Sequence, residues 1–183
     1  MIAEFIFPYN NEEEFARIAK ELGIKKIIFL YDEKDYDPAD KKLDFKTDVE
    51  IEKGIFLSKV NSSVKSKYIA VRSSDKDREI METRKANIIF GLEESGRKDF
   101  MHQRASGLNH ISCEIARKNN ITIGFSYSSL LKEHSSVIAG RMMQNFRLCR
   151  KFKVNTLIAS FTDDPYELRN RHDVNSLFKV LGF

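Results

Sequence analysis

Acidic residues stand in pairs directly after two apolar segments, where they could bind a metal ion. Glu93 and Glu94 form the first pair, and Asp163 and Asp164 form the second. Carboxylates that converge with histidines on one metal can activate water for hydrolysis. The four histidines are dispersed, however, without an HxH or HExxH pair. Solvated carboxylates at strand exits therefore remain the simpler interpretation, and we predict no metal site and no catalytic residue.

Motifs for cofactor binding and nucleophilic catalysis are also missing. The sequence contains no GxGxxG, GxxxxGK[ST] or GxSxG pattern, so it offers neither a phosphate-binding glycine loop nor a nucleophile elbow. Cys113 and Cys149 are the only cysteines. We interpret them as reduced, buried small hydrophobic residues rather than as a disulfide or a metal-binding pair. The sequence therefore predicts no cofactor in the protein.

Positive charge is concentrated in the second half of the chain. The net charge is +4, but residues 1–93 carry −2 and residues 94–183 carry +6. Such asymmetry favours a polyanionic partner, usually a nucleic acid. A surface that merely keeps the protein in solution would explain +4 equally well. The positions of the cations therefore matter more than their sum.

The cations of the second half fall into clusters that suit a phosphate backbone. In the predicted helix 134–152, Arg147, Arg150 and Lys151 lie opposite a core face, with little acidic compensation nearby. A solvated helix end, favoured by the helix dipole, is the alternative. Together the clusters favour a nucleic-acid surface. The residues that we predict to form it are Arg97, Lys98, Arg104, Lys118, Arg147, Arg150, Lys151, Arg169 and Arg171.

These cations must be positioned by alternating strands and helices in a single domain, residues 1–183. Apolar segments predict strands at 2–9, 26–31, 54–58, 68–72, 87–92, 121–126 and 155–160. Charged amphipathic segments predict helices from Asn10 or Asn11 to Gly23 and at 75–86, 108–119, 134–152 and 173–181. Residues 32–52 form a predicted loop with a short helix near 38–43. This order indicates an α/β fold with a parallel sheet, either doubly wound or closed as a barrel.

The chain shows no feature that would place it in a membrane or direct it to secretion. No apolar run approaches the roughly 18 residues of a membrane helix. The N-terminus carries Glu4 and has neither a basic region nor a small-residue cleavage site. We therefore expect a cytoplasmic protein without membrane contact.

Four segments occur in an order and spacing that resemble one known family. They are GLNHISCEIARKNNITIGFSYSSLL (107–131), RMMQNFRLCRKFKV (141–154), NTLIAS (155–160) and ELRNRHDVNSLFKVLGF (167–183). This ordered set is similar to the ribonuclease P protein component 3 family. Arg171 departs from it, because the family usually has proline near this position. The chain also ends at VLGF, where relatives continue for another element.

The resemblance implies both a fold and a role. The fold is a TIM-barrel-like α/β barrel of the polymerase and histidinol phosphatase (PHP) type, with about seven parallel strands, surrounding helices and no metal ligands. The role is that of a protein subunit of ribonuclease P, whose RNA removes the 5′ leader of precursor tRNA, with Mg²⁺ expected for that reaction. The partners would be the ribonuclease P RNA, precursor tRNA and other protein subunits, especially component 2.

The resemblance also suggests roles for single residues. Arg104, Lys118 and Arg169 fall where the family places basic residues, and Asp173 matches an acidic position. We expect Asp173 to cap the last helix or to orient Arg169. Two other functions stay open on the residues alone. One is a free-standing metal-dependent phosphoesterase barrel, and the other is a structural protein–protein module.

Overall fold

The computed structural model describes residues 3–36, 45–58, 65–96 and 98–183. The strands are β1 (Glu4–Ile6), β2 (Lys26–Asp32), β3 (Glu50–Leu57), β4 (Ile69–Arg72), β5 (Ile88–Phe90), β6 (Thr122–Ser126) and β7 (Asn155–Ala159). The helices are α1 (Glu12–Glu21), α2 (Asp77–Thr83), α3 (His110–Lys118), α4 (Ser135–Phe152) and α5 (Arg171–Val180). Short 3₁₀ turns follow β5, β6 and β7 at Leu92–Glu94, Ser128–Leu131 and Pro165–Glu167. Within these described ranges, no helix has the length and apolar content to cross a membrane.

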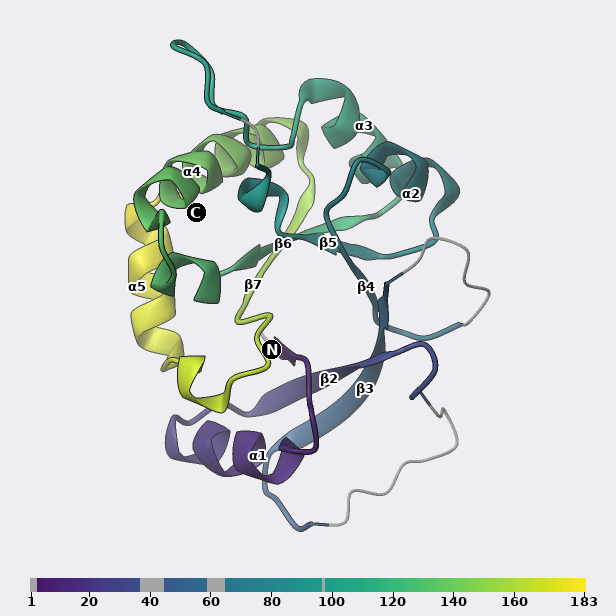
Figure 1. The fold of residues 1–183 in the computed structure, drawn as a ribbon, viewed down its shortest axis with the longest axis vertical. Helices are drawn as coiled ribbons and strands as arrows, with labels where there is room; N and C mark the ends of the chain where they lie inside the picture. Colours follow the sequence, from purple (N-terminus) through teal and green to yellow (C-terminus); the bar gives the residue numbers. More distant parts are fainter. Residues whose placement is uncertain (1–2, 37–44, 59–64, 97) are drawn as a thin grey trace.

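The seven strands form one parallel sheet that closes into a barrel (Figure 1). Neighbours in the sheet follow the chain order from β1 to β7. The chain beyond β7 then pairs with β1. Phe161 donates its backbone N–H to the carbonyl of Phe5 at 2.8 Å, and Phe7 donates to the carbonyl of Thr162 at 2.9 Å. The sheet is therefore closed through residues 160–162, and the barrel, not the doubly wound sheet, is the architecture.

Aromatic rings fill the inside of the barrel near the carboxyl ends of the strands. The rings of Phe90 and Phe161 stack with centroids 4.3 Å apart, and Phe7 meets Phe56 edge to face at 5.0 Å. Gly124 of β6 leaves room for this stack. A Cβ added there would lie 2.8 Å from Cζ of Phe161 and 3.0 Å from Cβ of Phe90. The mouth where barrel enzymes usually carry their active sites is thus occupied by packed side chains.

Gly124→Ala is expected to destabilise the protein by about 1–3 kcal/mol, because the new methyl group overpacks a rigid aromatic cluster. Urea denaturation at equilibrium measures this change as a lower midpoint with an unchanged slope. Gly96→Ala is the matched control, because a Cβ at Gly96 would meet nothing within 4 Å. Equal midpoints for the two variants would contradict the packing argument.

The helices cover the outside of the barrel, and α4 contributes the largest apolar face. Met142, Phe146 and Cys149 of α4 are buried, as its periodicity predicts. Arg141 and Asn145 are buried on the same helix as well, which periodicity does not predict. Polar side chains can enter a core only when they are hydrogen-bonded, so these two residues point to a buried network described below.

Several boundaries differ from the sequence predictions. The strand predicted at 54–58 begins at Glu50, because the whole of β3 pairs with β2 in register. The helix predicted at 75–86 spans only Asp77–Thr83, because Arg84 adopts a left-handed conformation (φ 54°) that ends it. Lys76 is the N-cap of this helix, and its side chain makes no capping hydrogen bond. The short helix predicted near 38–43 lies outside the described residues.

Candidate nucleic-acid interface

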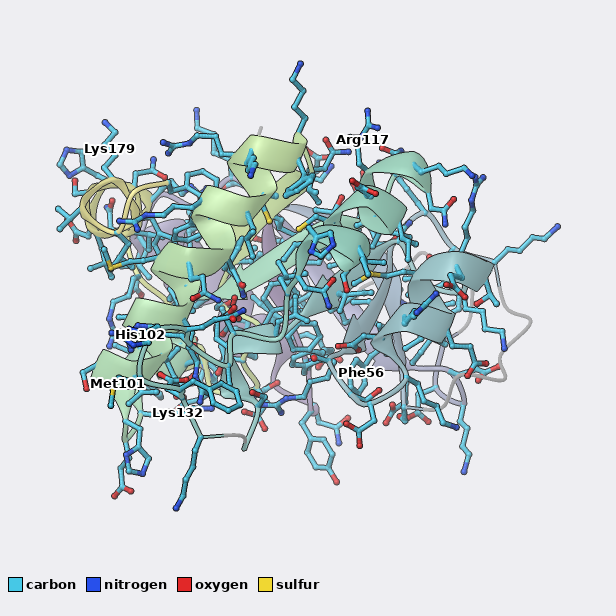
Figure 2. The ribbon with its side chains drawn as sticks, turned by 90° about the horizontal axis from the view of Figure 1, so that it is seen from above. Phe56, Met101, His102, Arg117, Lys132 and Lys179 are labelled. Atoms are coloured by element: carbon cyan, nitrogen blue, oxygen red, sulfur yellow. The ribbon has the colours of Figure 1, made fainter. Side chains whose placement is uncertain are left out.

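The two ends of the barrel carry different side chains (Figure 2). Helices α1, α2, α3 and α4 each return the chain to the start of the next parallel strand, so their C-terminal ends gather at the amino ends of the strands. Helix α5 instead crosses the barrel axis and is seen end-on in this view. Arg117 and Lys179, in the last turns of α3 and α5, lie at one edge of the view. Phe56, Met101 and Lys132 lie toward the opposite edge, the carboxyl-end side. The predicted cations can therefore lie on either of two faces, the amino-end face or the carboxyl-end face of the barrel.

The amino-end face carries a run of cations, which we call the amino-end basic rim. Its members end α2, α3, α4 and α5 and are all exposed: Arg84, Arg117, Lys118, Arg150, Lys151, Lys153 and Lys179. Among the described residues, none of them has a carboxylate within ion-pair distance. The helix dipoles favour cations at these ends. Uncompensated positive charge over four neighbouring helix ends is also the electrostatic footprint of a phosphate-binding surface.

Hydrogen bonds join the helix ends into one continuous surface. Arg84 Nε donates to Asn119 Oδ1 at 3.0 Å, which links the ends of α2 and α3. Asn155 Nδ2 donates to Asn120 Oδ1 at 2.8 Å, which links the segments that follow α3 and α4. The guanidinium of Arg150 donates to the carbonyl of Gly182 beyond α5. These bonds thus tie the helix ends together, and Arg84 and Arg150 are the rim cations that take part in them.

The amino ends of the first strands are neutralised instead. Lys26 at the start of β2 lies 2.5 Å from a carboxylate oxygen of Glu50 and 2.7 Å from one of Glu52. Lys67 also pairs with Glu52, at 3.0 Å. Hydrogen bonds from Lys26 and Lys67 lower the pKa of Glu52 to about 2. Lys20, in the last turn of α1, pairs with Asp48 at 2.5 Å. Apart from Arg84, the amino-end basic rim therefore belongs to the second half of the chain, whose net charge is +6.

The nine cations predicted from the sequence do not form one cluster. Lys118, Arg150 and Lys151 lie on the amino-end basic rim. Lys98 and Arg104 lie on a loop between β5 and α3, and Arg104 is 3.3 Å from Asp99. Arg147 is exposed on α4 and lines a hollow beside that loop. Arg97 lies outside the described residues, so its prediction is neither supported nor opposed. Arg84, Lys153 and Lys179 were not predicted as binding residues from the sequence; their shared position at helix ends is the signal for them.

Arg169 and Arg171 donate hydrogen bonds to backbone carbonyls in the C-terminal part of the chain. Arg169 is exposed, but its guanidinium donates to the carbonyls of Tyr166 and Leu168 at 2.7 and 2.8 Å. Arg171 is half-buried at the seam between β1 and β7. It donates to the carbonyl of Ile158 at 3.2 Å and lies 3.7 Å from a carboxylate oxygen of Glu4. Burial raises the pKa of Glu4 to about 7 and lowers the pKa of Arg171. Arg171 therefore supports the seam rather than the surface.

Asp173 does not cap the last helix. Asn170 is the N-cap of α5, and its side chain accepts the N–H of His172 at 2.8 Å. Asp173 stands in the first turn, where the helix dipole favours its charge. Asn170 precedes the helix in an extended conformation, so its short side chain reaches the free N–H groups first. No hydrogen bond from Arg169 to Asp173 is found among the described residues; backbone carbonyls hold Arg169 instead.

The paired carboxylates serve structural roles. The position of Glu93 directly after a strand predicts a solvated carboxylate, but the structure buries this side chain. It accepts a hydrogen bond from Asn145 at 2.8 Å and has its pKa raised by burial to about 7. Glu94 pairs with Arg72, and Asp164 caps the turn that begins at Pro165. In the described part of the chain, no group of three or more His, Cys, Asp or Glu side chains could hold a metal. Cys113 and Cys149 are buried and free, as predicted.

Comparisons of sequence and of fold agree with this geometry. Residues 98–183 match the model of the family described as RNase P subunit p30. Ribonuclease P protein component 3 of Methanocaldococcus jannaschii is 25% identical to the chain over 96 residues, which are 51% of this chain and 39% of that protein. The chain therefore spans about two fifths of the length of this curated relative.

Two solved structures share the barrel over nearly the whole chain. A chain in the cryo-EM structure of archaeal ribonuclease P with mature tRNA matches with a TM-score of 0.74 and 17% identity, over 98% of this chain and 82% of that one. Histidinol phosphate phosphatase of Lactococcus lactis, solved with zinc, L-histidinol and phosphate, matches with a TM-score of 0.66 and 9% identity, over 100% and 94%. These likenesses establish a TIM-barrel-like fold of the PHP type. Residues 98–183 are therefore similar to the RNase P subunit p30 family, and the chain as a whole shares the barrel fold of these two structures.

Proposed function

We propose that this protein is a subunit of ribonuclease P that binds RNA and supports the RNA-catalysed removal of the 5′ leader from precursor tRNA. The observation that carries the proposal is the amino-end basic rim. It lies largely within the residues that match the family, and no carboxylate among the described residues compensates it. Phosphate groups of RNA would supply the missing negative charge and release counterions on binding.

In this role the protein carries no catalytic residue of its own. Its contribution is to neutralise the RNA backbone and to stabilise the active RNA fold, while Mg²⁺ is expected to serve the RNA. The partners we propose are the ribonuclease P RNA, precursor tRNA and the other protein subunits, component 2 in particular. We propose the cytoplasm as the place of action. A metal-dependent phosphoesterase is not favoured, because phenyl rings occupy the mouth in which its ligands would have to converge.

Reconstitution tests the proposal. Purified protein is mixed with ribonuclease P RNA and the other subunits, and 5′ cleavage of precursor tRNA is measured with and without this chain, and with and without component 2. We expect cleavage that depends on the chain within the assembly and none from the chain alone. Cleavage that is unchanged when the chain is omitted would contradict the subunit role. An effect of the chain that persists without component 2 would contradict the proposed partner.

A further inference from the structure

The loop between β5 and α3 is held firmly at its base. Asp99 accepts hydrogen bonds from the N–H of Ala105 at 2.8 Å and from Nε of Arg141 at 2.9 Å. The bond to Ala105 joins the outgoing and returning segments of the loop, and the bond to Arg141 ties them to α4. Arg141 is only 6% exposed and also donates to the carbonyls of Glu93 and Ser95, at 2.9 and 2.7 Å. These bonds lower the pKa of Asp99, the contact with Ala105 most strongly. A buried, charged anchor thus fixes the start of the loop.

Helix α4 fixes the end of the loop in the same way. Gln144 accepts the N–H of Arg104 at 3.2 Å and donates to the carbonyl of Arg104 at 3.1 Å. Asn145 is fully buried and donates to the carbonyl of Ser106 at 2.8 Å. The guanidinium of Arg104 lies over Gly140, where any Cβ would overlap it. Hydrogen bonds thus hold both ends of the loop against α4, and they fix the position of its tip relative to the barrel.

The tip presents apolar side chains to solvent. Phe100 is 76% exposed and Met101 is 92% exposed. The turn is closed by the N–H of Phe100, which donates to the carbonyl of Gln103 at 2.8 Å. In Figure 1 this loop reaches outward beyond the ring of helices, and in Figure 2 Met101 and His102 lie away from the amino-end basic rim. Large exposed apolar side chains on a braced loop indicate a binding role.

Cations and hollows surround this tip. Phe100 lines a hollow of about 480 Å³ that it shares with Arg147 and Gly140 of α4. It also lines a second hollow of about 900 Å³, which carries both arginines and carboxylates, among them Arg72, Arg78, Asp75, Asp77 and Glu94. The exposed ring of Phe100, with the guanidinium group of Arg147 across the first hollow, suits a ligand that combines a planar base with phosphate groups.

We propose that the tip of this loop binds an unpaired nucleotide, with its base stacked on Phe100 and its flanking phosphates near Lys98, Arg104 and Arg147. The inference rests on the proposed function, because it assumes that the protein meets RNA. Unpaired bases are read by aromatic side chains combined with basic residues. A protein partner is less well matched, since interface cores are apolar and depleted of charge. The first hollow is lined by the apolar side chains of Phe100, Met101 and Met143 together with charged and polar side chains, among them Arg104, Arg147 and Asp99.

The test uses the full chain and a single-stranded oligoadenylate that contains 2-aminopurine, whose fluorescence falls when it stacks. Affinity and quenching are measured for the wild type, Phe100→Ala and Phe100→Trp, with an RNA duplex as a second ligand. We expect Phe100→Ala to weaken single-strand binding about tenfold and to abolish the quenching. Phe100→Trp should retain both, and duplex affinity should not change. Tyr9→Ala is the control, because Tyr9 is equally exposed but is followed by an acidic helix start.

The other outcomes separate this inference from the proposed function. In one outcome, Phe100→Ala keeps the quenching and the single-strand affinity of the wild type, and only mutation of the amino-end basic rim abolishes RNA binding. This outcome would overturn the inference and leave the proposed function standing. Failure of the wild type to bind either RNA would overturn both. Loss of a protein subunit from the reconstituted assembly in Phe100→Ala, with RNA binding intact, would assign the loop to a protein contact instead.

Discussion

Changing Lys118, Arg150 and Lys151 together to glutamate should weaken RNA binding by about two to three orders of magnitude near 0.1 M salt. Each lost phosphate contact removes roughly one released counterion, so the slope of log K against log salt should become shallower by about 3. The three side chains are exposed at helix ends, and the fold should therefore persist. Fluorescence anisotropy with labelled precursor tRNA between about 50 and 200 mM salt measures both quantities.

A matched triple variant separates position from net charge. Arg17→Glu, Lys20→Glu and Lys67→Glu change the charge by the same amount, but these cations already face carboxylates in the first half of the chain. We expect this control to retain most of the affinity and nearly the full salt slope. An equal loss in both triple variants would mean that RNA responds only to net charge, and the amino-end basic rim would then not be the interface.

Arg141→Met should lower the free energy of unfolding by about 3–5 kcal/mol, the range found when one partner of a buried charged network is removed. Methionine fills a similar space but leaves the carbonyls of Glu93 and Ser95 without the guanidinium donor and removes one of the donors to Asp99. Arg141→Lys should recover only part of the loss, because an ammonium group does not reproduce the fork of the guanidinium. Equilibrium urea denaturation measures the change.

Arg147→Met is the internal control for this experiment. It lies six residues further along the same helix and is exposed, so we expect an effect within about 0.5 kcal/mol. Similar losses at the two positions would show that α4 simply requires arginine for helix stability. A large loss at Arg141 alone, together with faster proteolysis between residues 98 and 106, would establish the anchoring role.

Much of the fold follows from the sequence because its strands are apolar and its helices are amphipathic. All seven strands and all five helices lie where hydrophobic patterns predict them, apart from their ends. The ends were wrong where local backbone conformation decides them. Arg84 ends α2 because it adopts a left-handed conformation, which its residue type does not predict. Strand β3 begins earlier than predicted because it pairs with β2 over seven positions. Closure into a barrel depends on contacts between residues 5–7 and 161–162, which periodicity cannot reveal.

The site was predicted less completely than the fold. Residue type identifies cations, but their use depends on what surrounds them. Arg171 has the same side chain as Arg150, yet it lies half-buried beside Glu4. Arg141 looks like a further surface cation in the sequence and is instead the buried anchor of a loop. Lys179 was not predicted, because it reaches the edge that carries Arg117 only through the position of α5, which lies across the barrel axis at that edge.

The seam between β1 and β7 has a consequence for synthesis of the chain on the ribosome. The partners of β1 at residues 160–162 are translated more than 150 residues after β1 itself. Until then, the growing sheet has two open edges that present unpaired backbone groups, and such edges invite pairing with other chains. Contacts so distant in sequence also form late and slowly. The nascent protein should therefore require protection by chaperones up to the moment of closure, and the backbone N–H groups that bond across the seam, those of Phe7 and Phe161, should be the last to become resistant to hydrogen exchange.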